Sequence, residues 1–547
     1  MAVAVPPRLA LRADLLAQLA APQTFDVTVV GGGATGLGVA LDAAARGLRV
    51  LLLEAHDFAK GTSSRSTKLV HGGVRYLAQG QLAFVRESLK ERALLLAHAP
   101  HLAQPLAFVI PTYRWWDKPF YGAGLKLYDA LARSAGLGAT ELLSPQQTQA
   151  LLPTVQTQGP CGGLKGGVKY WDGQFNDARL AITLSRTAAA HGALMLNYVR
   201  VNGLLYDQGR VTGLTCTDAE TGKSYRVRSR CVVNATGVWV NELCEQDDSV
   251  RATADAAGVT GPRSSAVTPS QGVHLVVGRE FLPGDAALMI PKTADGRVLF
   301  ALPWLGKVVL GTTDTPRDDM PLEPLPMAHE VDFILTEAGR YLSRPPTRRD
   351  VCSVWAGLRP LAHDAAGDRA STQGLSREHR IWTSPSGLLS VTGGKWTTYR
   401  AMAQDVMEAC FAHGLLDSVG QRRGVTEHLR LLGGDPADGP VSIREAEGIH
   451  SYGSEREYVL AFHNDEPELA PGLTSAMVRF AARHEYARTV EDVLARRSRL
   501  LFLDAGLAKQ VAPKVAMILA QETGVTPQAE QFDTLAANYL RLPTKVS

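Results

Sequence analysis

One stretch near the N-terminus decides the fold: FDVTVVGGGATG, residues 25–36. Its first half, residues 25–30, is largely apolar and predicts a strand buried in a parallel sheet. Residues 34–46 are rich in alanine and predict a helix that Gly47 ends. Residues 49–54, RVLLLE, predict a second buried strand, so the pattern is that of a β-α-β unit.

The motif Gly31-x-Gly33-x-x-Gly36 between the strand and the helix fits the fingerprint of a dinucleotide site. The first glycine permits a tight turn, the second lets the backbone approach a pyrophosphate, and the third lets the helix pack against the strand. Free N–H groups at the helix N-terminus favour the anion. Glu54, at the end of the second strand, is placed to accept hydrogen bonds from an adenosine ribose.

Two later glycine turns favour FAD over NAD, which the fingerprint alone does not distinguish. Residues 232–237, VVNATG, resemble the short strand and turn by which many flavoproteins return to the FAD domain. Gly393-Gly394-Lys395 follows another strand-like stretch, residues 388–391. Glycine turns so widely separated fit one long flavin lying across a domain, whereas an NAD dehydrogenase normally completes its nucleotide fold contiguously.

Composition bounds the class of protein. At 547 residues the chain is long enough for about two to four domains. A content of 45% hydrophobic and 20% charged residues is typical of a globular enzyme, and the net charge of +3 is too small to indicate a nucleic-acid partner. The six cysteines form no CxxC pair, so we expect no metal site, no disulfide framework and a reducing compartment.

Hydropathy predicts neither a membrane-spanning helix nor a secretory signal peptide. No apolar run approaches the roughly 20 residues that a spanning helix needs. Arg8, Arg12 and Asp14 interrupt the apolar stretch at the N-terminus. Residues 9–20 predict an amphipathic helix packed on the main body, with a membrane-surface helix as the alternative.

The rest of the pattern indicates an α/β fold. Residues 83–135 look mostly helical, with an interruption that contains proline and tryptophan, whereas 195–235 and 265–315 look like short strands. The chain is helical after residue 398, apart from a weakly ordered bridge at 432–440. We expect an FAD-binding Rossmann-like domain, an inserted β-rich substrate domain and a helical C-terminal domain. The expected bounds are 22–90, 165–245 and 355–412 for the FAD-binding domain, 91–164 and 246–354 for the substrate or cap domain, and 425–547 for the C-terminal domain.

Several longer strings carry a family resemblance. They are Thr62-Ser63-Ser64, STKLVHGGVRYL (66–77), WDGQFNDARL (171–180), QGVH (271–274), GTTD (311–314), GLRPL (357–361) and GKWTTYR (394–400). These strings resemble the D-amino-acid-oxidase-like flavoproteins and, within them, the aerobic, quinone-linked glycerol-3-phosphate dehydrogenases. The resemblance covers roughly residues 24–510, in order.

The resemblance implies an FAD-dependent enzyme that oxidises sn-glycerol 3-phosphate to dihydroxyacetone phosphate by hydride transfer to the flavin and passes the electrons to a membrane quinone. It implies that FAD is bound without a covalent bond, although His71 lies in a segment that carries flavin covalently in some related flavoproteins. The implied cofactor contacts are Gly31, Gly33, Gly36, Glu54, Thr62, Ser63, Lys68, His71, Gly72, Gly237, Gly394, Lys395 and Thr397.

Oxidation of a phosphorylated secondary alcohol needs a base for the hydroxyl proton and cations for the phosphate. The resemblance implies that Arg75, Arg359 and Lys395 line the substrate pocket, the arginines for phosphate or a polarised oxygen and the lysine for phosphate or flavin. His274 is the first candidate for the base, because imidazole titrates near neutral pH, with a structural role as the alternative. Tyr76 is expected to orient the substrate.

Other polar residues are expected to be structural. We expect Arg65 and Lys68 to be surface charges and Asp314 to cap a turn. The polar residues of 172–179 are expected to build a structural turn. In residues 483–499, acidic and basic side chains alternate at helical spacing, which predicts a solvated, salt-bridged face.

A quinone acceptor lies in lipid, so a chain without a spanning helix is expected to bind the bilayer surface. Residues 114–121 (RWWDKPFY) and 125–128 (LKLY) mix aromatic and basic side chains as interfacial anchors do, with a buried core edge as the alternative. The expected location is therefore cytoplasmic, at the inner face of the cell membrane, and a homodimer is left open.

Three alternative functions stay open at this point. They are a glycerol-3-phosphate oxidase that reduces oxygen, an amine or amino-acid oxidase of the same fold, and a non-enzymatic FAD-binding protein. Oxygen consumption without quinone would indicate the first, and turnover of glycine, sarcosine or D-amino acids the second. A flavin that glycerol 3-phosphate does not bleach would indicate the third.

Overall fold

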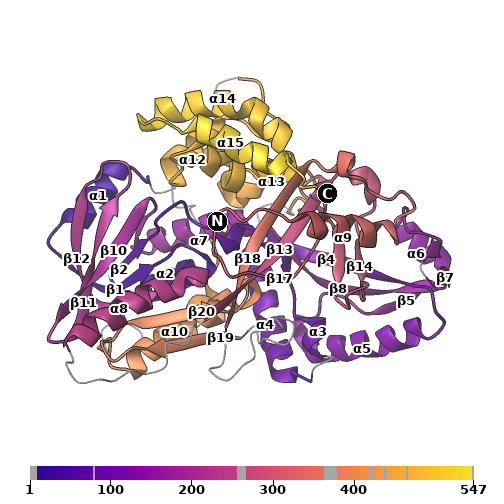
Figure 1. The fold of residues 1–547 in the computed structure, drawn as a ribbon, viewed down its shortest axis with the longest axis horizontal. Coiled ribbons are helices and arrows are strands. Elements are labelled where there is room, and N and C mark those ends of the chain that lie inside the picture. Colours follow the sequence, from indigo (N-terminus) through magenta and orange to yellow (C-terminus); the bar gives the residue numbers. More distant parts are fainter. Residues whose placement is uncertain are drawn as a thin grey trace.

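The strand that contains residues 25–30 lies inside the first of two large sheets (Figure 1). The structure is a computed structural model that describes residues 9–77, 80–159, 161–254, 267–362, 378–417, 423–435, 440–462 and 466–544. Residues 436–439 of the bridge predicted at 432–440 lie outside this part.

The first sheet has the parallel centre that the β-α-β pattern predicts. β1 (Thr24–Val30) pairs in parallel with β12 on one side and with β2 on the other, and β2 pairs with β9. β20 joins the carboxyl end of β12, also in parallel, and α2 packs against α7 and α10. The remaining elements of this body are β2 (Val50–Leu53), β9 (Leu194–Leu196), β10 (Val199–Asp207), β11 (Arg210–Asp218), β12 (Ser224–Asn234), β19 (His379–Thr383) and β20 (Leu389–Gly393), with α1 (Arg12–Ala20), α2 (Ala34–Ala45), α7 (Asp177–Ala190), α8 (Val240–Ala254) and α10 (Tyr399–Ala412).

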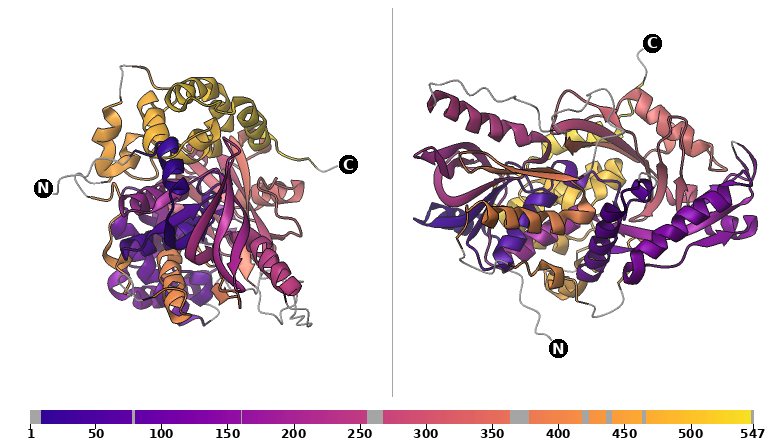
Figure 2. Two further views of the ribbon diagram at one scale, coloured as in Figure 1. Left: turned by 90° about the vertical axis from the view of Figure 1, so that its left-hand side faces the viewer. Right: turned by 90° about the horizontal axis from the view of Figure 1, so that it is seen from below.

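The second sheet is larger and mostly antiparallel. Its path runs β17-β13-β16-β15-β14-β4-β8-β3, with β18 paired to β13 and β5 paired to β8. Figure 2 shows from below how α4 and α5 lie together at one side of this sheet. The strands are β3 (Leu69–Val70), β4 (Ala103–Thr112), β5 (Glu141–Leu143), β8 (Gly166–Phe175), β13 (Val267–Val277), β14 (Ala287–Ile290), β15 (Leu299–Trp304), β16 (Lys307–Gly311), β17 (Thr315–Pro316) and β18 (Ser353–Ala362), and the helices are α3 (Val74–Leu77), α4 (Leu82–His98), α5 (Asp117–Ala132), α6 (Pro145–Leu151) and α9 (Ala328–Gly339). A separate hairpin pairs β6 (Gln158–Gly159) with β7 (Gly162–Gly163).

Residues 83–135 are mostly helical, in α4 and α5, but the interruption between these helices includes the strand β4, which the sequence did not identify. This strand is covered on both faces: Leu106 and Phe108 point into one apolar core, and Ala107 and Val109 point into another. A strand buried on both faces lacks the alternation of polar and apolar residues that identifies a strand in a sequence. Its continuous apolar run therefore could not be told from a buried helix.

The C-terminal helices lie above the two sheets (Figures 1 and 2). α13 and α15 pack against β18, and the π-helical segment Asp492–Arg497 packs against α7. The helices of this region are α11 (Arg456–Leu460), α12 (Ser475–His484), α13 (Leu500–Leu503), α14 (Ala505–Thr523) and α15 (Ala529–Leu540). Among the described residues, none of the helices combines the length and the hydropathy needed to cross a bilayer.

The prediction of a solvated charged face at residues 483–499 is wrong. Glu485, Asp492, Arg496, Arg497 and Arg499 are all buried. Their partners come from distant parts of the chain, as when Glu485 accepts two hydrogen bonds from a guanidinium nitrogen of α7, at 2.8 and 2.9 Å. Alternating charge at helical spacing thus reflects a buried ion-pair network here, because the neighbouring elements carry the complementary charges.

The predicted α/β class, with a helical C-terminal region, is confirmed. The N-terminal helix also packs on the main body as expected, because Leu15 and Leu19 lie in the core of the first sheet. β8 and β18 belong to the second sheet, although the expected bounds place β8, and most of β18, in the FAD-binding domain.

Candidate functional site

A cavity of about 410 Å³ opens between the two sheets. Its lining comes from segments far apart in the sequence: the turn after β1, residues 62–76, the turn after β12, strands β13 and β18, and the turn after β20. Its volume lies in the range of small-molecule sites. The carboxyl ends of β1, β12 and β20 meet at this place, as they do around ligands in open α/β sheets.

The glycine turn after β1 depends on the absence of side chains. Gly31 has a φ of +108°, and a Cβ there would lie 2.6 Å from the carbonyl oxygen of Ala235. A Cβ on Gly36 would lie only 1.9 Å from the carbonyl oxygen of Gly31, so α2 can approach the turn only with glycine at this position. Gly33 is the N-cap of α2 and lines the cavity. Each glycine thus occupies the position that the fingerprint assigns to it.

Glu54 supports the same turn from the end of β2. One of its carboxylate oxygens accepts a hydrogen bond from the Gly32 N–H at 2.7 Å, and the other accepts one from the His56 N–H at 2.9 Å. Burial raises the pKa of Glu54 above its ordinary value, against the effect of these two donors. Glu54 is not part of the cavity lining.

Thr62 and Ser63, expected to contact the flavin, both line the cavity. The Thr62 hydroxyl donates to the carbonyl oxygen of Leu358 at 2.6 Å, and the Ser63 hydroxyl accepts from the Ala34 N–H at 2.9 Å. Trp396 donates from its indole nitrogen to the carbonyl oxygen of Ser63 at 2.8 Å. These bonds fix the 62–63 segment between α2 and β18.

The other side of the cavity is formed by two glycine turns and the segment around His71. Gly237 and Gly394 line it at φ of +63° and +73°. The Thr397 hydroxyl accepts from the His71 N–H at 3.2 Å, and both residues line the cavity. Gly72 faces away from it, since a Cβ there would meet the Tyr128 hydroxyl at 2.3 Å.

Lys68, expected either as a surface charge or as a cofactor contact, is fully buried outside the cavity. Its ammonium donates to Asp177 at 2.6 Å and lies 4.4 Å from the ring centroid of Trp355. Burial lowers the pKa of Lys68 to about 7, although Asp177 opposes the shift. Arg65 is also buried and not a surface charge, but it lines the cavity. This burial could not be predicted from the sequence, because the carboxylate that neutralises Lys68 is more than 100 residues away.

The polar residues of 172–179 support this wall. Asn176 caps α7 with its side chain, and Asp172 accepts hydrogen bonds from Arg92 at 2.9 Å and from the Tyr128 hydroxyl at 2.8 Å. All are buried. These residues lie at the end of β8 and the start of α7, and Asp172 also lines the cavity.

Positive side chains line the cavity from both sheets, among them Arg359 on β18 and Lys395 in the turn after β20. Arg359, on β18, donates to Asp314 at 3.2 Å and to the Thr312 hydroxyl at 3.1 Å. The Lys395 ammonium lies 4.5 Å from the ring centroid of Phe84. Arg75 lies on α3, but its side chain is outside the described part of the structure.

His274 lies on β13, which pairs with the strand that carries Arg359, and is only 1% exposed. Its Nε2 is 3.0 Å from the Thr67 hydroxyl, and its ring stacks on Trp355 with centroids 4.1 Å apart. Its Nδ1 is buried and has no partner among the described residues. Burial, and then the charges of Lys68 and Arg359, hold the pKa of His274 well below its ordinary value. The imidazole is therefore neutral and able to accept a proton near pH 7.

The structure adds site residues that the sequence did not single out. Thr67 and Thr312 line the cavity, and Asp314, expected only to cap a turn, contacts Arg359 there. Gly272 makes room for Arg359, because a Cβ at this glycine would lie 2.3 Å from its guanidinium. The available signal for these residues was their position: Thr67, Gly272 and Thr312 all lie inside the strings that carry the family resemblance.

Tyr76 also lines the cavity. It is 9% exposed, packs edge-on against Phe84 and lies with its ring centroid 5.5 Å from the Lys395 ammonium. The lining also includes a set of mainly apolar side chains, Leu69, Phe108, Tyr170, Met289, Val298 and Phe300, together with the charged residues Asp172 and Arg297. One cavity therefore combines cations with a mainly apolar set of side chains.

These residues fit an FAD molecule. Three glycine turns, at Gly31, Gly237 and Gly394, surround one cavity, and each glycine has a positive φ that side chains rarely adopt, which provides room for a long cofactor to touch the backbone. The first turn of α2 carries no acidic side chain that would repel a pyrophosphate. The described residues contain no cluster of metal-binding side chains.

Two family models match the chain. The model described as FAD dependent oxidoreductase matches residues 26–400, and the C-terminal domain of alpha-glycerophosphate oxidase matches residues 424–530. The mitochondrial glycerol-3-phosphate dehydrogenase of Schizosaccharomyces pombe is 38% identical over 572 residues, which cover 94% of this chain and 86% of that protein. The human mitochondrial glycerol-3-phosphate dehydrogenase is 39% identical over 538 residues, which cover 91% of this chain and 70% of that protein.

Solved structures give the same result. The glycerol-3-phosphate dehydrogenase from Bacillus halodurans complexed with FAD superposes with a TM-score of 0.75 and 30% identity, covering 98% of this chain and 99% of that one. The L-alpha-glycerophosphate oxidase from Mycoplasma pneumoniae with FAD bound shares the fold, with a TM-score of 0.54 and 16% identity over 74% of this chain and 99% of that one.

Proposed function

The chain belongs to the FAD dependent oxidoreductase family and, within it, to the glycerol-3-phosphate dehydrogenases, and from this premise we propose that it oxidises sn-glycerol 3-phosphate to dihydroxyacetone phosphate. The family resemblance and the FAD cofactor predicted from the sequence are thereby confirmed. One observation carries the proposal: the dinucleotide turn at Gly33 and the cations Arg359 and Lys395 open into a single cavity.

The protein residues bind and orient the substrate, and bound FAD supplies the hydride acceptor. Arg359 is the primary phosphate ligand, because its guanidinium already lies in a frame of Asp314 and Thr312 that fixes its direction. Lys395 adds a second positive charge for the phosphate or the flavin. We assign Arg75 to the same cluster from its sequence motif, and Tyr76 to orienting the substrate.

His274 is the proposed base. It takes the proton of the C2 hydroxyl at Nε2, the nitrogen that reaches Thr67, because Nδ1 is buried. Burial, and then the charges of Lys68 and of the phosphate ligand Arg359, keep the imidazole neutral before the reaction. The stack on Trp355 fixes the plane of the ring.

The flavin contacts are proposed for three discontinuous stretches. The segments 22–90, 165–245 and 355–412 are assigned to the FAD-binding domain because they supply Gly33, Gly237 and Gly394 to the same cavity. Residues 91–164 and 246–354 are assigned to the substrate domain and 425–547 to the C-terminal domain. The bond to FAD is non-covalent in this proposal.

Anaerobic addition of sn-glycerol 3-phosphate to the purified holoprotein tests this function. The visible flavin absorbance should disappear with the phosphorylated substrate and persist with glycerol, which lacks the group that Arg359 binds. An unchanged spectrum with both compounds would refute the proposal. Bleaching by D-amino acids instead would support the amine-oxidase alternative.

The electron acceptor is proposed to be a membrane quinone. The mainly apolar part of the cavity lining, which includes Phe108, Met289 and Phe300, suits an apolar acceptor better than a charged one. Turnover should therefore require a short-chain quinone and consume little oxygen without it. Oxygen consumption at the full rate in the absence of quinone would assign the chain to the oxidase alternative.

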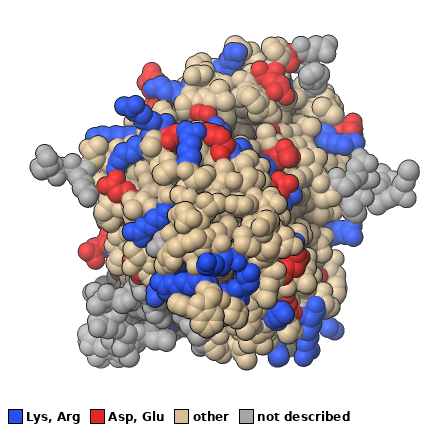
Figure 3. All heavy atoms as spheres, turned by 90° about the vertical axis from the view of Figure 1, so that its right-hand side faces the viewer, with Lys and Arg blue, Asp and Glu red and all other residues tan. Residues whose placement is uncertain are grey.

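A surface for the bilayer is proposed on α5 and the residues before it. Trp115, Trp116, Phe120 and Leu127 are 77, 47, 72 and 50% exposed, and the last three follow one another along one face of the helix. Exposed Arg114 and Lys126 lie in the same segment. Figure 3 views the molecule from this end and shows Lys and Arg side chains grouped beside uncharged surface. Aromatic residues bordered by basic ones are the composition of interfacial membrane contacts.

Sedimentation with lipid vesicles tests this surface. The variant Trp115→Ser/Trp116→Ser/Phe120→Ser should lose most binding to vesicles of phosphatidylcholine and phosphatidylglycerol, yet keep activity with a soluble dye. Met517→Ser is the control, since Met517 is 58% exposed on α14, among the helices at the other side of the molecule (Figure 1). Equal vesicle binding by both variants would refute the proposed bilayer surface on α5. It would also refute the proposed location at the inner face of the cell membrane.

A further inference from the structure

The loop between β2 and the cavity segment is tied to the glycine turn. Besides the bonds from Glu54, the Ala59 N–H donates to the carbonyl oxygen of Gly32 at 2.9 Å. Phe58 packs so closely that a Cβ on Gly32 would lie 2.7 Å from its ring. The position of residues 54–59 therefore determines the position of the turn that faces the pyrophosphate.

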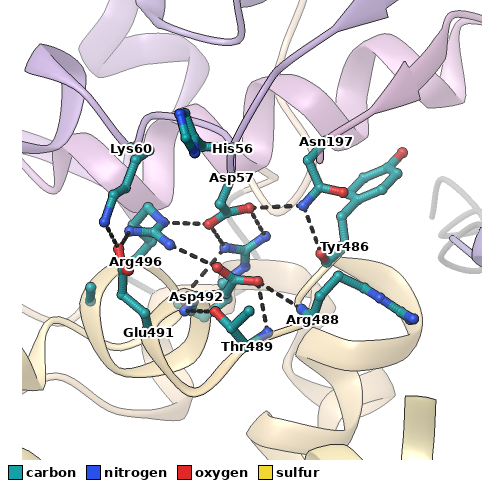
Figure 4. Close-up of polar contacts among 12 residues, drawn as sticks. His56, Asp57, Lys60, Asn197, Tyr486, Arg488, Thr489, Glu491, Asp492 and Arg496 are labelled. Carbon is teal, nitrogen blue, oxygen red and sulfur yellow. Dashed lines mark hydrogen bonds and ion pairs between the residues drawn. The ribbon is translucent and has the colours of Figure 1, made fainter. Parts of the chain in front are cut away.

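The C-terminal region holds this loop from the other side through Asp57 (Figure 4). Asp57 is 1% exposed, and its carboxylate contacts the guanidinium groups of both Arg496 and Arg497. Burial raises the pKa of Asp57, but the two arginines outweigh burial and bring it below its ordinary value. Asn197 donates a further hydrogen bond at 3.0 Å. Asp57 is thus an ionised, dry carboxylate whose charge is balanced by two residues from the C-terminal end.

A second connection runs through Lys60 (Figure 4). Its ammonium lies 2.5 Å from Glu491 and 2.5 Å from Glu323. Glu491 also accepts a hydrogen bond from Arg496 at 2.6 Å. Glu323 in turn contacts Arg65, a residue of the cavity wall, at 2.7 Å. The C-terminal segment is therefore connected by ion pairs to both the loop and the wall.

Such a network resists movement of the loop. A carboxylate between two buried guanidiniums cannot separate from them without leaving charges that neither water nor another partner solvates. The loop that carries Asp57 also carries the contacts to Gly32. Displacement of the C-terminal segment would therefore alter the turn at which FAD is held.

We propose that Arg496 and Arg497 are positioning residues for the cofactor: directly through Asp57, and through the bridge from Arg496 to Glu491 and Lys60, they fix the nucleotide end of the FAD site, so that the C-terminal region determines how firmly the chain retains FAD. The inference rests on FAD as the cofactor and does not depend on which substrate is oxidised. It gives the C-terminal domain, whose described residues form none of the cavity lining, a part in the retention of the cofactor.

The rate at which FAD leaves the full-length holoprotein tests the proposal. Free flavin is followed by its fluorescence after dilution of the wild type and of Asp57→Asn, which removes the charge at nearly constant size. The expected result is release that is about tenfold faster or more in Asp57→Asn, the range of coupling found between groups in contact. The kcat at saturating FAD and the KM for glycerol 3-phosphate should remain within about twofold, because no cavity residue is changed.

Arg483→Ala is the matched control. It removes a C-terminal arginine–carboxylate pair, to Glu522 at 2.6 Å, that is more exposed than the Asp57 pair and does not contact the loop. Equal release rates in Asp57→Asn and Arg483→Ala would overturn the proposal, whatever their melting temperatures. So would a lower melting temperature of Asp57→Asn with wild-type release, since the pair would then be structural only.

Lys60→Met provides a second, milder test in case Asp57→Asn does not fold. It keeps Asp57 with both arginines and cuts the bridge between Glu491 and Glu323. Release should be about threefold faster or more than in the wild type. Wild-type release in Lys60→Met overturns the proposal on its own. A holoprotein that fails to oxidise glycerol 3-phosphate but releases FAD as expected would refute the proposed function and not this inference.

Discussion

Replacing Gly36 by alanine inserts a methyl group at the point where α2 approaches the turn after β1. The new Cβ would lie 1.9 Å from the carbonyl oxygen of Gly31 and 3.3 Å from a methyl carbon of Val29. The first distance must widen to at least 3.0 Å, and the obstacle is backbone rather than a flexible side chain. The helix N-terminus therefore has to move away from the turn, together with the N–H groups that face the pyrophosphate.

The expected loss follows from the cost of overpacking. Inserting a methyl group into a filled space costs about 1–3 kcal/mol. Most of that strain is relieved only when α2 shifts, so we expect it to appear in cofactor binding, as a Kd for FAD that is about 5- to 150-fold higher. Flavin fluorescence titration of Gly36→Ala measures the Kd directly.

Gly124→Ala is the matched control, because Gly124 lies inside α5 and a Cβ there meets nothing within 4 Å. Alanine at this exposed helical position should leave FAD binding unchanged and raise the free energy of unfolding by about 0.4–1 kcal/mol. If Gly36→Ala binds FAD as tightly as Gly124→Ala does, close approach of α2 is not what shapes the site.

The remaining predictions concern the site and the buried network. His274→Ala should lower kcat by about 100-fold or more in dye-linked assays. In the wild type, the lowered pKa of His274 should keep kcat/KM level as the pH falls from about 8 to 6, because the imidazole stays unprotonated until the pH reaches its lowered pKa. A decline centred on the ordinary histidine pKa would argue against this base. Arg359→Ala should weaken phosphate binding by about 1.5–3 kcal/mol, seen as a KM raised about 10- to 150-fold, and an unchanged KM would remove Arg359 from the phosphate site. Arg179→Met should lower the free energy of unfolding by about 3–5 kcal/mol in urea titrations, because it leaves Glu485 buried without its main partner. Lys509→Ala, which breaks an exposed ion pair, should lower it by less than about 1 kcal/mol. Equal losses in the last two variants would contradict the burial of the network.

Local sequence determined the dinucleotide turn. A strand, a glycine turn and a helix interact over about ten residues, so their geometry is encoded where they stand: Gly31 needs a positive φ, and Gly36 must lack a side chain. The strands of β10, β11 and β12 were also predicted, because polar turns separate them and they pair with their neighbours in sequence. The candidate chemistry of Arg359 and His274 came from the strings in which they stand, and both line the cavity.

Only the tertiary structure decided which charges are buried and which face the cavity. Lys68 and Arg496 look like surface residues in the sequence, because a charged side chain without a nearby opposite charge is normally solvated. Their partners Asp177 and Asp57 are 109 and 439 residues away, and only folding brings these carboxylates next to them. The strand β4 was missed for the same reason, since the two cores that cover its faces come from other parts of the chain. Whether a side chain is buried depends on which distant segments pack against it, and the local sequence does not determine those segments.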